Sequence, residues 1–256
     1  MKQIILFILL GAMAHVVSAQ KYSFMLKGDI INVKDGKVLL YSPVDSVKVL
    51  LATEMKDGLF TLAGELDEPG LYTLDVAGAR FSIVLDGKEM TLYGDYLQPD
   101  TKLLKGSPAV KTRLELERLY YENFDMMVNE GLEKYYEMTE NEQKQSDQAE
   151  EFIGQVIRDA SSNWRTHLLE FVKTHPDDLY VPVLLMREVR QGIEWGKKAY
   201  EALTPKMQAS QPGRLLKAKL DNLSHTVVGA MFPTFAVQDA KGNMVDLKFG
   251  NGKVYV

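Results

Sequence analysis

The hydrophobic pattern of the chain changes its period at Gly106-Ser107-Pro108. Before this point, short apolar runs alternate with turn signals such as Asp35-Gly36 and Asp57-Gly58, where glycine tolerates the positive φ of tight turns. After it, apolar residues recur at roughly helical spacing as far as Leu223. The change predicts an α+β fold in which a β part precedes a helical part.

Residues 20–106 are predicted to form an N-terminal β domain. Gly28 lies inside the first apolar run, and a glycine at such a position often marks a β-bulge. Regularly spaced short strands separated by turns are typical of an antiparallel β-sandwich or a partly open barrel. We expect strands near residues 24–33, 38–41, 47–51, 59–62, 71–76, 81–85 and 90–93.

Residues 107–226 are predicted to form a helical linker domain. Ser107 is a suitable N-cap, and Pro108 fits the first helical turn because its missing N–H has no partner there. The clearest amphipathic stripe covers residues 149–172 and ends before His175-Pro176, since the residue before proline is disfavoured in helical conformation. Asp177 is expected to cap the next helix, and Thr204-Pro205 to begin a further turn.

Two positions in the helical part leave alternatives open. Gly131 either interrupts the first helix or is carried within it, because the apolar pattern continues beyond it. The polar stretch 139–148 is either a solvated helical segment or a loop. No internal repeat of fixed period is visible, which argues against a solenoid.

Composition excludes several classes of function. A net charge of −5 over 256 residues gives no general attraction to nucleic acid or to an anionic membrane. Cysteine is absent, so the chain itself offers no disulfide framework, thiolate metal site or cysteine nucleophile.

The N-terminus has the pattern of a secretory signal peptide. Met1-Lys2 supplies a positive start, residues 4–13 an apolar run, and Val17-Ser18-Ala19 a small-residue cleavage site. Residues 1–19 are therefore predicted to be removed near Ala19, and an uncleaved anchor is the alternative. The cleavage point has no cysteine for lipid attachment. We expect an exported, periplasmic protein with no membrane span after cleavage.

Searches for catalytic motifs find no Gly-rich phosphate loop, no His-Glu-x-x-His and no Gly-x-Ser-x-Gly. His167, His175 and His225 are each isolated, which favours surface or helix-end positions over metal binding. Asp177-Asp178 is interpreted as a helix cap rather than an acid/base pair. No catalytic, cofactor-binding or metal-binding residue is predicted, and no cofactor.

Aromatic and methionine residues in the helical part have two interpretations. Helical spacing explains them as core packing, and a ligand groove is the alternative. Met126-Met127 and Met186 are either core filler or adaptable binding residues. The charged stretch 140–151 is interpreted as a solvated surface. The aromatic residues are Tyr120, Tyr121, Phe124, Tyr135 and Tyr136.

Residues 227–256 contain the most specific pattern, in which a hairpin of residues 234–238 and 244–247 is followed by a further strand start. This stretch resembles the start of a TlpA-like thioredoxin-fold domain, a family grouped with the AhpC-TSA-type proteins. The residues that carry the resemblance are Val228-Gly229, Phe232-Pro233-Thr234-Phe235, Asp239-Ala240-Lys241-Gly242-Asn243, Val245-Asp246-Leu247 and Gly252-Lys253-Val254-Tyr255-Val256.

The resemblance implies thiol–disulfide interchange by two cysteines of a Trp-Cys-x-x-Cys motif, the first attacking a disulfide and the second resolving the mixed intermediate. In the family this motif follows the Gly-Lys strand, whereas this sequence reaches only Val256. No catalytic residue can therefore be assigned, and residues 227–256 are expected to be an incomplete thioredoxin-like domain. The β part and the helical stretch 171–177 also resemble segments that precede such domains in exported proteins.

Two hypotheses follow. In the first, the chain is the N-terminal portion of an exported thiol–disulfide interchange protein, interrupted by truncation or an incomplete gene model. It then acts in placement or partner recognition, and the full-length form has a protein partner or a disulfide-bearing substrate protein. In the second, the chain is a complete periplasmic binding or interaction protein with a β domain and no catalysis.

Overall fold

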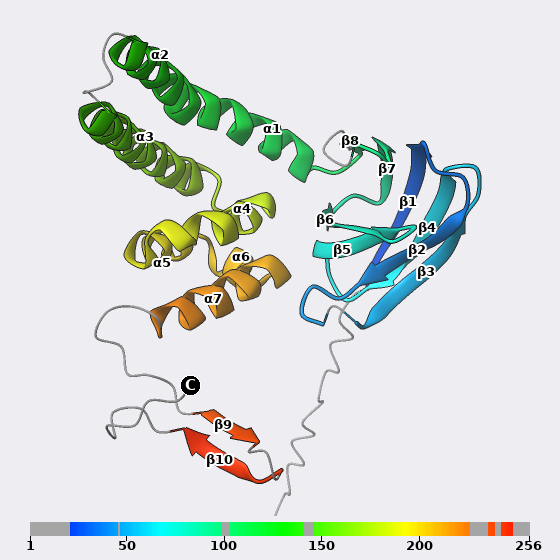
Figure 1. Cartoon of the computed structure of the whole chain (residues 1–256). Helices are drawn as coiled ribbons and strands as arrows, with labels where there is room; N and C mark the ends of the chain where they lie inside the picture. The colour runs from blue at the N-terminus through cyan, green and yellow to red at the C-terminus, as the bar shows by residue number, and fades with distance from the viewer. Residues whose placement is uncertain are drawn as a thin grey trace, which may run out of the picture.

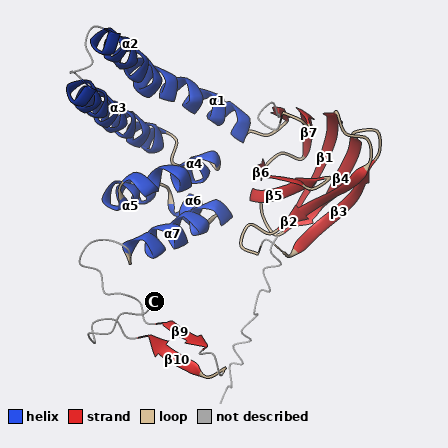
Figure 2. Ribbon diagram, viewed as in Figure 1, coloured by secondary structure: helices blue, strands red, loops and turns tan. Residues whose placement is uncertain are grey.

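A computed structural model describes residues 21–45, 47–98, 103–140, 146–225, 235–238 and 242–247. The predicted signal peptide and its cleavage site at Ala19 lie outside these ranges. Figure 1 shows the chain passing from a β part into a layer of helices beside it, and Figure 2 shows that strands and helices are segregated. The α+β prediction is confirmed.

The β part consists of two four-stranded sheets, one ordered β4-β1-β7-β8 and the other β3-β2-β5-β6. Their side chains form one shared core, to which Leu26 and Leu62 contribute from the first sheet and Leu40 and Leu74 from the second. The strands are β1 (Tyr22–Ile31), β2 (Gly36–Tyr41), β3 (Val49–Met55), β4 (Leu59–Leu66), β5 (Gly70–Val76), β6 (Ala79–Leu85), β7 (Glu89–Asp95) and β8 (Leu103–Lys105).

The prediction that the β domain is antiparallel is wrong for one strand pair. β1 and β7 are parallel, with Leu26 opposite Met90 and Gly28 opposite Leu92. The two strands are separated by most of the β domain, so no hairpin fixes their relative direction. The remaining pairs are antiparallel, and the described strands form no closed barrel.

Gly28 allows a close contact rather than a bulge, so the bulge prediction is also wrong. The pairing of β1 with β4 runs without a register shift, and Gly28 lies opposite Phe60. A Cβ at position 28 would come within 1.9 Å of the Phe60 ring. The ring fills the space that a side chain would occupy, which explains the glycine inside the strand.

The helical part has a second core around Leu168, Leu185 and Leu216. Helix α1 continues through one π-helical stretch, η2, into α2, and α2 packs along α3 (Figure 1). The elements are α1 (Ala109–Tyr120), η2 (Tyr121–Asp125), α2 (Met126–Glu140), α3 (Ser146–Thr174), α4 (Tyr180–Glu188), η3 (Val189–Gln191), α5 (Ile193–Glu201), α6 (Pro205–Ala209) and α7 (Gln211–Ser224).

Two predicted N-caps are wrong because neighbouring carboxylates take their place. The Ala109 N–H at the start of α1 donates to Asp86 Oδ2 at 2.8 Å, whereas Ser107 makes no capping bond. At α4, Asp178 Oδ1 accepts from the Tyr180 N–H at 2.8 Å, while Asp177 accepts from the Thr204 hydroxyl.

The remaining helix predictions can be checked directly. Thr204 caps α6, with Pro205 in its first turn, as predicted.

Gly131 lies within α2, where an added Cβ would come 2.5 Å from Val156 Cγ1 of α3. The absence of a side chain therefore allows α2 and α3 to approach closely. Both ends of the polar stretch 139–148 are helical, and residues 141–145 lie outside the described chain.

The predicted C-terminal hairpin is present. β9 (Phe235–Gln238) and β10 (Met244–Leu247) pair antiparallel, with Val237 opposite Val245. Gly242 has a φ of 84°, the left-handed conformation that a tight turn favours in glycine. Residues 227–234, 239–241 and 248–256 lie outside the described ranges.

Candidate functional site

The first residue of α7 joins the helical part to the β part. β2 ends at Tyr41, which pairs with Thr73, so β2 does not bond the backbone of Leu71. The side chain of Gln211 takes this place. The Leu71 N–H donates to Gln211 Oε1 at 2.9 Å, and Gln211 Nε2 donates to the Leu71 carbonyl at 2.6 Å. We call this pair of bonds the Gln211 clasp.

Glu68 supports the clasp from the loop before β5. One of its carboxylate oxygens accepts from the Gln211 N–H at 2.9 Å, and the carboxylate also pairs with Arg214. A Cβ at Gly70 would come 2.3 Å from Gln211 Oε1, so glycine leaves the space that the carboxamide occupies. Together with the Asp86 bond to α1, the clasp attaches the helical part to the β part at two points.

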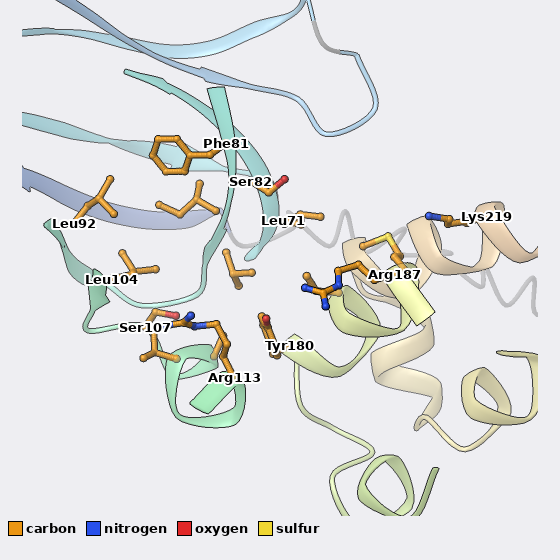
Figure 3. Close-up of a pocket in the computed structure, with 16 residues that line it drawn as sticks. Leu71, Phe81, Ser82, Leu92, Leu104, Ser107, Arg113, Tyr180, Arg187 and Lys219 are labelled. Carbon is orange, nitrogen blue, oxygen red and sulfur yellow. The ribbon is translucent and has the colours of Figure 1, made fainter. Parts of the chain in front are cut away.

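Between these two attachments lies a cavity of about 450 Å³, which we call the junction cavity (Figure 3). One wall comes from β5 to β8 and the other from α1, α4 and α7. Most of its lining is apolar, with a few polar groups among the apolar side chains. The lining residues are Leu71, Phe81, Ser82, Ile83, Val84, Leu92, Leu104, Ser107, Ala109, Val110, Arg113, Tyr180, Val183, Met186, Arg187 and Lys219.

Three cationic side chains line the helical wall of the junction cavity. Arg113 on α1 forms an ion pair with Glu117 at 2.8 Å, one turn along the same helix. Within the described parts of the chain, neither Arg187 of α4 nor Lys219 of α7 has a carboxylate within 4.0 Å. Among the described residues that line this cavity none is acidic, so their charged groups are all positive.

Tyr180 lies between the two arginines in Figure 3. Burial raises the pKa of its phenol, and the positive charges of Arg113 and Arg187 oppose this rise. The group is therefore a neutral hydroxyl at physiological pH and can donate a hydrogen bond. Burial also lowers the pKa of Lys219, and the charge of nearby Arg190 adds to the effect.

Where α1 meets the β part, two buried polar atoms lack a hydrogen-bond partner of regular geometry among the described residues: Asp86 Oδ1 and Ser107 Oγ. Ser107 is 7% exposed and belongs to the cavity wall. Burial raises the pKa of the Asp86 carboxyl, while the Ser107 hydroxyl and the Ala109 N–H oppose the rise. Buried polar atoms are usually bonded, and the effect of Ser107 on Asp86 indicates that these two groups interact with each other at the edge of the cavity.

A second cavity of about 230 Å³ adjoins the first, and the two share Arg113, Tyr180 and Arg187. Its walls are more polar and include Trp164 and the buried residue Glu188. The Trp164 Nε1–H donates to Glu188 Oε2 at 3.1 Å, which holds that carboxylate. The shared arginines and tyrosine thus lie at the boundary between an apolar and a polar space.

The aromatic residues singled out in the sequence divide between core and surface. Tyr120 packs on Phe124 with ring centroids 4.9 Å apart and meets Trp164 edge-on at 5.0 Å. The core interpretation is confirmed for these residues, although Tyr120 also lines the second cavity. It is wrong for Tyr121 and Tyr136, which are 54% and 60% exposed.

Each histidine of the helical part either contacts its own helix or lies at a helix end. His175 follows the last residue of α3 and stacks on Phe171 with ring centroids 4.0 Å apart. His167 Nδ1 lies 3.0 Å from the Asn163 carbonyl oxygen of the preceding turn, and His225 is the C-cap of α7. No group of three or more His, Cys, Asp or Glu residues in the described chain could hold a metal ion.

Sequence reasoning did not identify the residues that define the junction cavity. Met186 is the exception, because it was interpreted as either core filler or a binding residue, and it packs on the helical core while lining the cavity. The adjacent Arg187 is an ordinary cation of an amphipathic helix, so nothing in its local sequence marked it. Nothing in the local sequence distinguishes Gln211 from other glutamines, because its role depends on Leu71, far away in the chain.

No known family model matches the chain, and no curated protein or solved structure matches it either. Among the helices that the structure describes, none combines the length and the apolar character needed to cross a bilayer. The described residues form an α+β fold with a cationic, apolar-walled cavity at the junction of its two parts.

Proposed function

We propose that residues 21–225 form the recognition part of an exported thiol–disulfide interchange protein whose thioredoxin-like domain begins in residues 227–256. The observation that carries this proposal is the pattern of residues 228–256, which resembles the start of a thioredoxin-like domain and includes the β9–β10 hairpin. The Gln211 clasp ties the helical part to the β part, so the two parts can act together as one recognition module. A module of this kind can hold a partner or a disulfide-bearing substrate protein beside a redox domain that follows it.

The role is placement and recognition, because the 256 residues contain no cysteine. Thiol–disulfide exchange needs a thiolate nucleophile, so it would come from residues after Val256. The signal-like N-terminus and its Ala19 cleavage site favour export to the periplasm, an oxidising compartment where such exchange is common.

The test is the nucleotide sequence that follows codon 256. The proposal expects Trp-Cys-x-x-Cys shortly after Val256, in frame or after a single frameshift, because the family places this motif after the Gly-Lys strand. A long downstream frame with unrelated sequence would contradict it. N-terminal sequencing of the protein from a periplasmic fraction tests export, which predicts a mature chain that starts at Gln20.

A second candidate is an exported binding protein without catalysis. The junction cavity favours it, since a cavity of 450 Å³ with apolar walls and a few polar groups has the properties of a small-molecule site. The same downstream sequence separates the two candidates. A stop codon directly after Val256, with no cysteine motif in any frame, supports the binding protein.

A further inference from the structure

We propose that the junction cavity binds a single-chain amphipathic carboxylate, with its apolar body between the two parts of the chain and its carboxylate against Arg187, Arg113 and Tyr180. This site does not depend on the thiol–disulfide proposal. It specifies the ligand of the binding-protein candidate, which rests on the same cavity, and its failure would leave the thiol–disulfide proposal standing.

The apolar walls of the junction cavity favour a ligand with an apolar chain. The sheet side presents Leu71, Ile83 and Leu104, and the helical side presents Val183 and Met186. An apolar chain that enters such a space removes its own surface and that of the walls from water, which is favourable in proportion to the area buried. Met186 adds adaptability, because its unbranched side chain can adjust to different apolar shapes.

The cationic side chains of the cavity favour a ligand with a negatively charged group. Arg187, Arg113 and Lys219 supply positive charge, and the described lining residues include no carboxylate. Of the acids in the neighbouring cavity, Glu117 is already paired with Arg113, and Glu188 is bonded by Trp164. The third acidic residue that lines the neighbouring cavity is Asp125 of η2. A carboxylate at the boundary of the two cavities would give Arg187 an anionic partner and the Tyr180 hydroxyl an acceptor.

Ser107 adds a hydroxyl to the cavity where β8 leads into α1. It is 93% buried and lines the junction cavity, and its Oγ has no hydrogen-bond partner of regular geometry within the described residues. The Asp86 carboxyl interacts with this hydroxyl, so an anionic group is disfavoured beside Ser107 and the carboxylate of the ligand belongs beside Arg187.

The experiment compares four probes by titration calorimetry on the mature chain. Decanoate carries both features of the proposed ligand, decanol lacks the charge, acetate lacks the apolar body, and decylammonium reverses the charge. We expect saturable binding of decanoate at millimolar concentration or below and at least about tenfold weaker binding of the other three. Equal affinity for decanoate and decanol would overturn the carboxylate assignment, and the absence of decanoate binding would overturn the site.

Variants locate the carboxylate. Arg187 is exposed, so Arg187→Met should fold normally. It should weaken decanoate binding about tenfold or more without changing decanol binding, because a charge-assisted hydrogen bond is lost. Arg158→Met on α3 removes the same charge away from the cavity and should change neither. An equal loss in both variants would indicate nonspecific attraction and contradict the assignment.

The apolar wall is tested independently of charge. Val110→Phe fills space in the cavity from α1, and we expect it to weaken decanoate and decanol alike. In protein labelled with ¹³C-methyl methionine, the Met186 resonance, assigned with Met186→Leu, should shift on addition of decanoate. Decanoate binding that leaves the Met186 resonance unchanged would place the ligand elsewhere and refute the proposal.

Discussion

The carboxamide of Gln211 bonds both backbone groups of Leu71, as a residue of a neighbouring strand would. The Leu71 N–H lies 2.9 Å from Gln211 Oε1, and the Leu71 carbonyl oxygen lies 2.6 Å from Gln211 Nε2. Because β2 ends before this position, a side chain from α7 completes the bonding of β5. The hydrogen bonding of β5 in the β part therefore depends on the docking of α7 in the helical part.

Removing the Gln211 carboxamide should destabilise the protein. Gln211→Ala leaves the Leu71 N–H and carbonyl without their partner, and we expect a loss of about 1 to 3 kcal/mol in the free energy of unfolding. Denaturant titration measures this loss, and hydrogen exchange should show a less protected Leu71 amide. Gln155→Ala is the matched control, because the Gln155 side chain bonds Asp159 and Arg158 on its own helix. Unchanged Leu71 protection in Gln211→Ala would show that the clasp does not hold in solution.

Adding one methyl group at Gly70 should have the same effect as removing the clasp. The new Cβ would come 2.3 Å from Gln211 Oε1, so the carboxamide would have to move. If Gly70→Ala acts only through the clasp, the double variant with Gln211→Ala should be little less stable than the single ones. Fully additive losses in the double-mutant cycle would contradict this mechanism.

Only part of this junction could be predicted from the sequence. The change of period at Gly106-Ser107-Pro108 located the passage from strands to helices, because periodicity is a local property. The partner of Leu71 and the N-cap of α1 come from residues distant in sequence, Gln211 and Asp86. The parallel pairing of β1 with β7 likewise depends on how distant strands meet, and no local signal records it.

The candidate site was hidden for the same reason. Arg113, Arg187 and Lys219 lie on three different helices and face one cavity only after these helices pack against the sheet. In the sequence each is an ordinary cation of an amphipathic helix. The hairpin of β9 and β10, in contrast, was predictable because its turn and both strands lie within a few residues.

Asp86 should give the folding stability a recognisable pH dependence. Burial raises the pKa of its carboxyl above the ordinary value of 3.8, so between these two values the folded state binds more protons than the unfolded state. Its contribution to stability is therefore greatest below pH 3.8 and falls as pH rises through the folded-state pKa. Asp86→Asn keeps an oxygen acceptor for the Ala109 N–H but cannot ionise.

We therefore expect Asp86→Asn to gain stability relative to the native protein as pH is raised from 3 to 7. Asp86→Ala, which loses the cap, should be less stable by about 1 kcal/mol at acidic pH, where the native carboxyl is neutral. Thermal denaturation across this pH range measures both effects. A stability difference between Asp86→Asn and the native protein that does not change with pH would refute the assigned burial effect.

Substitution of Gly131 should destabilise the protein, although the residue lies within a helix. Alanine favours a helix over glycine by about 1 kcal/mol, but its Cβ would lie 2.5 Å from Val156 Cγ1. Gly131→Ala should therefore destabilise the native protein and stabilise the Val156→Ala variant, in which the space has been opened. A stabilising effect of Gly131→Ala in both backgrounds would mean that α2 and α3 are not in close contact.

The most direct test of the proposed function is disulfide reduction measured with two proteins. One is the 256-residue chain, and the other is the product of the natural reading frame continued past codon 256. Insulin reduction should be absent above buffer for the first, which has no cysteine, and present for the second. Replacing the first cysteine of its expected Cys-x-x-Cys motif by serine should abolish the activity. Reduction by the 256-residue chain, or none by the continued product, would contradict the proposal that this chain is the recognition part of a thiol–disulfide interchange protein.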